Sequence, residues 1–422
     1  MKYLSTALLT SLIILTACAH NPVSGKKEFS IISERQEQEI GKTNYQTMIQ
    51  AQGGPYTQDP ELVAYVQSVG KKLAAVSHRP HLDYEFVILN DSVPNAWALP
   101  GGKVAINRGL LVELSSEAEL AAVLGHEITH AVARHGAKGL ERGLLLQGSV
   151  VALGVALDDK KYSDILVTGA SVGAMLVQQK YSRMQELEAD RLGMSYMNRA
   201  GFAPDAAVTL QETFLRLSKD KKSVWIDSLF ASHPPSQERI DTNKETLATM
   251  QAKSEFYGRE EYLEKISNLQ KQQEAYKAHD EAKRALSEKN IHVAKEYIKQ
   301  ALLSSPQEAL FWQTLGDLHM KERDQKRALT AYSRAIELNP NYFQPYLKRS
   351  KIYARTQEYQ LATQDAKASV ALLATGDGHE LLGQLYLIQD NKPLAQHHLQ
   401  IASRADSKAG KRARNTLTRL SE

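Results

Sequence analysis

A repeat with a period of about 34 residues fills the C-terminal third of the chain and restricts its fold more than any other feature. In the clearest copy, aromatic, aliphatic and small residues recur at fixed offsets, and a proline closes the unit. These positions are Trp312, Leu315, Gly316, His319, Ala328, Tyr332, Ala335 and Pro340. Three further copies keep the register around Ala294, Tyr353 and Gly383. Each unit predicts two antiparallel helices that meet through small residues, and stacked units form a curved all-α solenoid.

The spacing of these positions matches the tetratricopeptide repeat. We expect four such repeats over residues 275–409, with a helical linker at 251–274 before them and a basic capping tail at 410–422 after them. The stacked helices predict a concave surface that holds a peptide or a protein partner. The basic residues between Lys408 and Arg419 favour a solvated capping helix. The alternative is a basic surface that binds an anionic partner.

The N-terminus has the pattern of a targeting segment. Lys2 is followed by an apolar stretch from Leu4 to Leu15, which is too short to span a membrane, and then by Cys18. This pattern predicts a lipoprotein signal peptide at 1–17 and a lipidated tether at 18–30, with a plain cleaved signal peptide as the alternative. Because Ala19 rather than Asp follows the cysteine, we expect a periplasmic protein anchored in the inner leaflet of the outer membrane. A chain with a single cysteine has no internal disulfide.

The most specific chemical motif is the pentapeptide His126-Glu127-Ile128-Thr129-His130. It lies in a predicted helix that opens with a capping box at Ser116 and Glu119. Residues four apart lie on one helical face, about 6 Å apart along the axis, so both imidazoles can bind one Zn²⁺. Glu127 then stands beside the metal as a general base. The alternative is a pair of core histidines with this spacing by chance.

A catalytic zinc needs a third protein ligand, and Glu186 is the best candidate because Asp190 lies on the same predicted helical face. Asp190 would accept the free N–H of a ligating histidine. Glu188 is expected to point away as a solvated carboxylate. His135, five residues after His130, is expected to lie off the ligand face and to be structural.

The remaining patterns predict a mainly α domain with a small β-sheet over residues 31–250. Helices are expected from Ser33 to about Gln50, from Asp59-Pro60 onward and over 181–199, with strands at 84–89 and on either side of Pro100-Gly101-Gly102. Two apolar runs at 144–157 and 165–177 favour a buried or amphipathic helical hairpin, with contact to a membrane or partner as the alternative. A net charge of +4 gives no ground for nucleic-acid binding.

Four segments together resemble the zinc metallopeptidase family of HtpX and the CAAX prenyl proteases, and within it the periplasmic BepA type that carries tetratricopeptide repeats. The matching segments are Asn95 to Gly102, His126 to His130, Ser182-Arg183 with Glu186 and Ala189-Asp190, and Ser232 to Pro235 with Arg239. The resemblance implies a zincin-type α+β domain followed by the repeats. It also implies a gluzincin-like site with one zinc on His126, His130 and Glu186, and Glu127 as general base.

The same resemblance gives roles to three further elements. His233 would occupy the open metal position as a fourth ligand and hold the enzyme in check; the alternative is a loop histidine or a hydrogen-bond donor to the transition state. Arg239 would contact the substrate or the transition state. The strand at 104–107 would pair with an extended substrate, or else be an ordinary sheet strand.

These features predict a zinc metalloendopeptidase that degrades misfolded or stalled envelope and outer-membrane proteins, with the repeats binding clients or the outer-membrane protein assembly machinery. The alternative is a chaperone or adaptor for outer-membrane protein assembly, whose peptidase activity is largely gated by His233. A membrane contact through the lipid anchor is expected in both cases.

Overall fold

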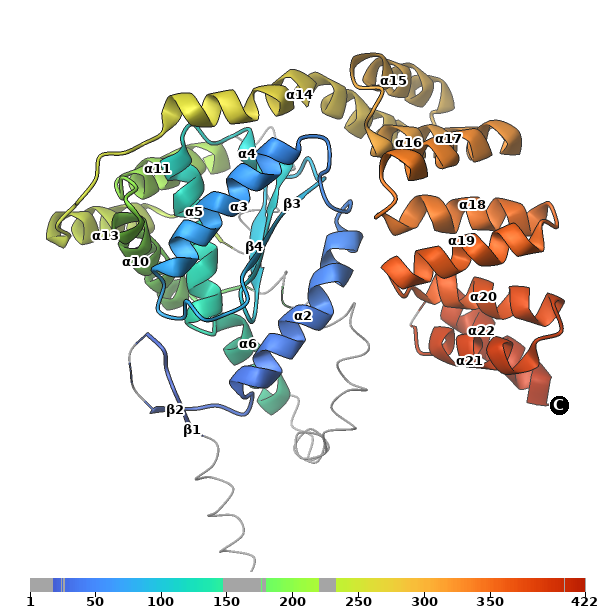
Figure 1. Ribbon diagram of the computed structural model, residues 1–422, viewed down its shortest axis with the longest axis horizontal. Coiled ribbons are helices and arrows are strands. Elements are labelled where there is room, and N and C mark those ends of the chain that lie inside the picture. Colours follow the sequence, from blue (N-terminus) through green and yellow to red (C-terminus); the bar gives the residue numbers. More distant parts are fainter. Residues whose placement is uncertain are drawn as a thin grey trace, which may run out of the picture. The chain divides into compact units, whose positions relative to one another are not determined.

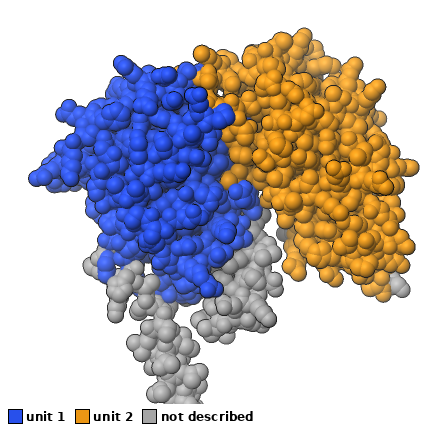
Figure 2. All heavy atoms as spheres, viewed as in Figure 1, with its two compact units in different colours: residues 1–48, 60–267 blue, residues 49–59, 268–422 orange. Residues whose placement is uncertain are grey.

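The computed structural model describes residues 18–23, 25, 27–146, 176, 180–219, 233–405 and 407–421. Most of the two predicted apolar runs at 144–157 and 165–177 lies outside these residues, as do Ser232 and the predicted signal peptide. The chain divides into two compact units (Figures 1 and 2). The first comprises Met1–Met48 and Pro60–Ser267, and the second comprises Ile49–Asp59 and Asn268–Glu422. Among the described residues, no helix is both long enough and apolar enough to cross a membrane.

The first unit contains a three-stranded sheet in the order β3-β5-β4. Strands β3 (Glu85–Leu89) and β5 (Lys103–Asn107) run parallel, and β4 (Ala96–Leu99) pairs antiparallel with β5. The predicted turn joins β4 to β5, with Gly101 and Gly102 at φ values of +79° and +86° that favour glycine. Because β5 is paired on both sides, the expectation that it receives a substrate strand is wrong. It is an ordinary strand of the sheet.

Helix α5 (Glu117–Val132) forms the centre of this unit, and all of its residues are buried. It packs against α3 (Pro60–Ala75), α10 (Arg183–Ala200), α11 (Ala206–Lys219) and β4 (Figure 1). The side chain of Ser116 accepts the N–H of Glu119 at 3.1 Å, as the capping pattern predicts. The carboxylate of Glu119, however, accepts the N–H of Ser115 at 2.7 Å.

The close crossing of α5 and α10 depends on two glycines. A Cβ on Gly193 would lie 3.1 Å from the backbone nitrogen of His126, and one on Gly125 would lie 3.2 Å from the carbonyl oxygen of Gly193. Without side chains at this point, the two backbones approach closely. The crossing therefore brings the acidic residues of α10 beside the pentapeptide of α5.

A buried ion network fixes the C-terminal end of α5. Glu37 on α2 (Glu34–Ala51) is fully buried and accepts from Arg79 Nη1 at 3.0 Å and from Arg134 Nε at 2.8 Å. Arg134 adopts a left-handed backbone with φ +61°, which ends α5 and turns the chain into α6 (His135–Leu146). Among the described residues, the unit also contains β1 (Cys18–His20), β2 (Lys27–Phe29), α4 (Arg108–Leu111) and α13 (Gln237–Thr249).

The second unit is a series of helix pairs, as the repeat predicts. It contains most of α14 (Arg259–Ser287), followed by α15 (Ile291–Ser304), α16 (Ala309–Lys321), α17 (Gln325–Leu338), α18 (Phe343–Arg355), α19 (Tyr359–Leu372), α20 (Gly376–Ile388), α21 (Lys392–Ser403) and α22 (Lys408–Ser421). Small residues lie at the helix contacts. Ala328 and Ala335 are fully buried, and a Cβ on Gly316 would collide with the ring of Tyr332.

Residues 49–59 also belong to the second unit, although they precede it by more than two hundred positions in the sequence. The amide nitrogen of Gln50 donates to the carbonyl of Asn341 at 2.7 Å, and its amide oxygen accepts the N–H of Phe343 at 3.0 Å. These bonds join the segment to the loop before α18. No periodicity in the sequence indicates this long-range contact.

Candidate metal centre

Four buried side chains present metal-ligating atoms to one point, all within 4.8 Å of one another. His126 and His130 come from one face of α5, Glu186 comes from the first turn of α10, and His233 comes from the loop before α13. None of the four side chains is more than 11% exposed. The structure thus brings together the three ligands expected from the sequence and the fourth that the family resemblance implied.

The separations within this cluster fit a tetrahedral ion. His126 Nε2 lies 3.0 Å from His130 Nε2 and 3.2 Å from His233 Nδ1. Glu186 Oε1 lies 3.1 Å from His233 Nδ1 and 3.5 Å from His130 Nε2. Ligands bound at about 2.0–2.1 Å in a tetrahedron lie about 3.3 Å apart. These four separations are therefore close to those between ligands around a tetrahedral metal ion.

His126 is oriented by a carboxylate that is itself held by an arginine. Its Nδ1 lies 2.8 Å from Asp190 Oδ1, as the helical spacing predicts. Arg239 donates to both Asp190 oxygens, at 2.8 and 2.7 Å, and lies 2.9 Å from Glu186. Since Arg239 is 5% exposed and binds two carboxylates, its clearest role is to fix α10 beside the ligands. Its implied contact with substrate stays a prediction.

His130 is oriented by a second series of hydrogen-bonded side chains, which was not predicted from the sequence. His130 Nδ1 lies 2.9 Å from His135 Nδ1, and His135 Nε2 lies 3.0 Å from Glu188 Oε2. In a continuous helix, His135 would lie off the ligand face, as predicted from the sequence. The helix instead ends at Val132, and the left-handed turn at Arg134 returns His135 to His130. Glu188 does point away from the ligands, but it contacts His135 and is not simply solvated.

The charges of the cluster favour a bound cation. Burial opposes the imidazolium form of His126, but Glu186 and Asp190 outweigh burial and raise the pKa of His126 to about 10. Burial dominates at His130, so its pKa lies well below the usual value. Burial likewise opposes the charged form of Glu186, yet His233 and His126 hold its pKa well below the usual range. The cluster thus attracts positive charge, which a metal supplies as it displaces a proton.

Glu127 stands beside the ligand cluster and does not belong to it. Its Oε1 lies 3.6 Å from His233 Nε2. Its Oε2 is buried and has no hydrogen-bond partner among the described residues. A buried carboxylate oxygen without a partner is costly in a stable fold unless a ligand or water satisfies it. Glu127 therefore has a free acceptor oxygen beside the ligand cluster.

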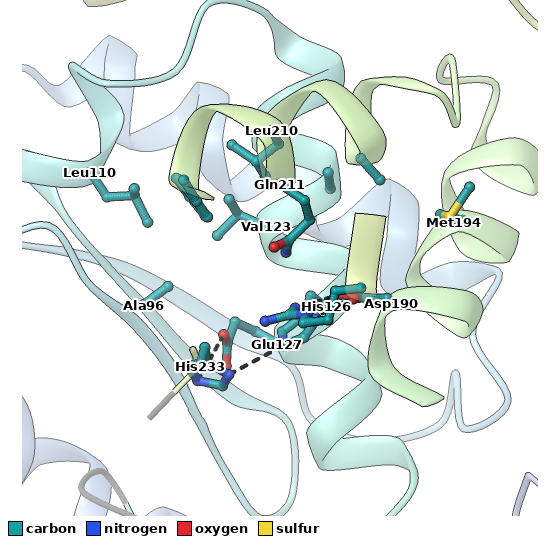
Figure 3. Close-up of a pocket in the computed structure, with 14 residues that line it drawn as sticks. Ala96, Leu110, Val123, His126, Glu127, Asp190, Met194, Leu210, Gln211 and His233 are labelled. Atoms are coloured by element: carbon teal, nitrogen blue, oxygen red, sulfur yellow. Dashed lines mark hydrogen bonds and ion pairs between the residues drawn. The ribbon is translucent and has the colours of Figure 1, made fainter. Parts of the chain in front are cut away.

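A mostly apolar hollow adjoins Glu127 and His126. Figure 3 shows Glu127, His126 and His233 together on one side of it, with Leu110, Val123 and Leu210 on the other. Helix α11 supplies much of the apolar wall. No local pattern in the sequence indicates the hollow, because its walls come from elements distant in the chain.

Comparison with known proteins agrees with this geometry. Residues 60–247 match the model of peptidase family M48, and residues 309–342 match the tetratricopeptide repeat. The chain is 33% identical over 237 residues to the mitochondrial metalloendopeptidase OMA1 of Schizosaccharomyces pombe, covering 56% of this chain and 68% of that protein. It is 30% identical over 262 residues to the putative beta-barrel assembly-enhancing protease of Vibrio cholerae, covering 58% of this chain and 53% of that protein.

A third relative extends into the repeats. The beta-barrel assembly-enhancing protease of Escherichia coli is 23% identical over 348 residues, which cover 76% of this chain and 70% of that protein. The ligand cluster, the family match and the repeat match support one conclusion. The chain belongs to peptidase family M48, and it is a metallopeptidase with tetratricopeptide repeats on the C-terminal side of its catalytic domain.

Proposed function

We propose that this protein is a zinc-dependent endopeptidase that cleaves misfolded or stalled proteins of the bacterial envelope. The observation that carries the proposal is the tetrahedral cluster of His126, His130, Glu186 and His233 with Glu127 beside it. Imidazole and carboxylate donors in a tetrahedron suit Zn²⁺ better than Mg²⁺ or Ca²⁺, which prefer oxygen ligands at higher coordination number. The relatives named as beta-barrel assembly-enhancing proteases support an envelope substrate.

In the proposed mechanism, each residue of the site has one task. His126, His130 and Glu186 would hold a zinc ion, which would supply Lewis acidity for the activation of water and of the peptide carbonyl. The free oxygen of Glu127 accepts a proton from the attacking water and returns it to the leaving amine. Asp190 accepts the N–H of His126, which keeps the other ring nitrogen available to the metal.

The direct test is metal content together with cleavage. We expect one zinc per chain by elemental analysis, cleavage of reduced and carboxymethylated serum albumin, and little cleavage of native serum albumin. The unfolded protein exposes extended segments that the folded protein does not. A correctly folded sample that binds no zinc, or that cleaves neither substrate, would contradict the proposal.

We also propose that the protein is tethered at the periplasmic face of the outer membrane through Cys18. The support is the apolar segment that precedes the single cysteine, together with Ala19 after it. In cell fractionation, wild type is expected in the outer-membrane fraction and Cys18→Ser in the soluble periplasmic fraction. Equal membrane association of the two proteins would argue against the tether.

His233 supports a second candidate function, that of a chaperone or adaptor whose peptidase site is mostly closed. Its Nδ1 completes the tetrahedron, where a catalytic zinc ordinarily keeps a position for water. With His233 in place, binding of clients or of an assembly partner by the helix pairs of the second unit would be the main activity of the protein. The two functions differ only in how often His233 leaves the cluster.

Substitution of His233 separates these functions. If His233 occupies the cluster in about nine of ten molecules, His233→Ala is expected to raise the cleavage rate about tenfold, with zinc retained by the other three ligands. The rate on unfolded serum albumin and the zinc content are the measurements, and His292→Ala, on an exposed residue of the repeats, is the control. A lower rate in His233→Ala would show instead that His233 assists the reaction.

A further inference from the structure

Among the described residues, the ring of His233 contacts three other aromatic rings. Two belong to the ligands His126 and His130, with ring centroids 5.1 and 5.2 Å from the centroid of His233. The third belongs to Tyr181, with centroids 5.4 Å apart and ring planes at 36° to each other. Aromatic rings attract each other at centroid separations of about 4.5–7 Å. Tyr181 is therefore the one described ring that contacts His233 without offering a ligand atom to the cluster.

Tyr181 is itself held by the two helices that carry the other ligands. Its ring stacks on that of His130 from α5, with centroids 3.7 Å apart and planes 21° apart. The next residue, Ser182, begins α10, because its side chain accepts the N–H of Gln185 at 3.4 Å. Glu186 follows in the first turn of that helix. The position of Tyr181 is therefore set independently of the loop that carries His233.

The other polar contacts of His233 and its loop belong to groups that have a task in the site. The Nδ1 of His233 lies 3.1 Å from the ligand Glu186, and its Nε2 lies 3.6 Å from Glu127 (Figure 3). The carbonyl of the next residue accepts a hydrogen bond from Arg239, which also lies 2.9 Å from Glu186. Tyr181, by contrast, is neither a ligand nor the base of the proposed mechanism. Its contact with His233 can therefore change how often His233 occupies the cluster while the ligands and the base stay in place.

We infer that Tyr181 is a positioning residue that retains His233 in the ligand cluster and so lowers the resting peptidase activity. An equilibrium between two arrangements responds only to contacts that differ between them. The stack on His130 does not involve His233 and is expected in both arrangements, whereas the contact with His233 exists only while His233 is in the cluster. One aromatic pair shifts such an equilibrium about two- to tenfold. The inference rests on the proposed function and adds a second residue to the regulation of the same site.

The test is substitution of Tyr181 in the full-length protein, with and without His233. If His233 occupies the cluster in about nine of ten molecules, Tyr181→Leu is expected to raise the rate of cleavage of unfolded serum albumin about two- to fivefold. In the His233→Ala background no imidazole is left to retain, so the same change is expected to give no increase. Tyr181→Phe keeps the ring and is expected to cleave like wild type.

A second measurement does not depend on cleavage. With cobalt in place of zinc, the visible absorption spectrum reports the ligands of the ion. His233→Ala removes one imidazole from these ligands, and Tyr181→Leu is expected to shift the spectrum part of the way toward that of His233→Ala. Tyr181→Phe is expected to keep the wild-type spectrum. Loss of packing against His130 alone would lower the affinity for the metal without this shift.

Controls separate the inference from folding and from the function on which it rests. Tyr297→Leu, the same change at a half-buried tyrosine of α15, is expected to keep the wild-type rate and spectrum. Tyr181→Met is measured beside Tyr181→Leu, with metal content and circular dichroism, so that poor folding of one variant does not decide the test. An unchanged or lower rate in the non-aromatic variants, an equal rise in both backgrounds, or a changed rate in Tyr181→Phe would overturn the inference alone. Absence of metal or of cleavage in wild type would overturn the proposed function as well.

Discussion

Glu127→Gln is expected to lower the rate of cleavage of unfolded serum albumin by a factor of about 10²–10⁴ while the protein keeps its metal. The amide has the size of the carboxylate but cannot accept a proton from water. Glu127 is not among the four ligands, and its Oε2 has no partner among the described residues, so the change breaks no bond that the structure shows at that atom. The loss should therefore fall on catalysis and leave metal binding intact.

The measurements are the cleavage rate, the zinc content and the thermal unfolding temperature of the two proteins. Glu245→Gln, an identical change on an exposed part of α13, serves as the matched control and is expected to cleave like wild type. Treatment of wild type with a chelator gives the reference for complete loss of the metal. If Glu127→Gln cleaved at the wild-type rate, another group would have to be the base.

His135→Phe is expected to weaken metal binding about 10- to 100-fold. When the Nε2 of His130 faces the metal, its Nδ1–H donates to His135 Nδ1, and His135 Nε2–H donates to Glu188. Each hydrogen bond fixes the tautomer of one imidazole. The two bonds, from Glu188 through His135, therefore keep His130 in the tautomer that binds a metal through Nε2. Phenylalanine fills the same space without either ring nitrogen, which removes the orientation but leaves the packing.

Competition with a fluorescent chelator measures this affinity directly, independently of cleavage. Glu188→Gln is expected to weaken binding in the same direction by a smaller factor, because the amide still accepts the N–H of His135. His81→Phe, at an exposed histidine of the same unit, is the control. Unchanged affinity in His135→Phe would show that His135 is only a packing residue, as the sequence alone suggested.

Patterns inside one element predicted much of the molecule. The spacing of His126, His130, Glu186 and Asp190 placed each pair on one helical face, and the structure brings all four together. The repeat likewise predicted the helix pairs of the second unit, because every unit buries the same small residues against its neighbour. Such inferences succeed because helix geometry fixes the relation between residues three and four apart.

The expectations that failed depended on where an element ends or on what lies beside it. His135 joined the site because α5 ends early at a left-handed arginine, and the strand at 104–107 lies in the middle of the sheet, with both of its edges paired. Residues 49–59 joined the repeats through hydrogen bonds of Gln50 and Gln58. None of these contacts repeats along the chain, so periodicity does not reveal them.

The sequence by itself therefore determined which residues form the candidate site: two histidines and a glutamate of one helix and an acidic residue of a second helix, with a solenoid after them. Only the tertiary structure decided how these residues are arranged and which space adjoins them. The crossing of α5 and α10 at Gly125 and Gly193 closes the ligand cluster, and α11 builds the apolar hollow beside it. The physical reason is that local periodicity sets which face a residue occupies, whereas close packing between distant segments sets which faces meet.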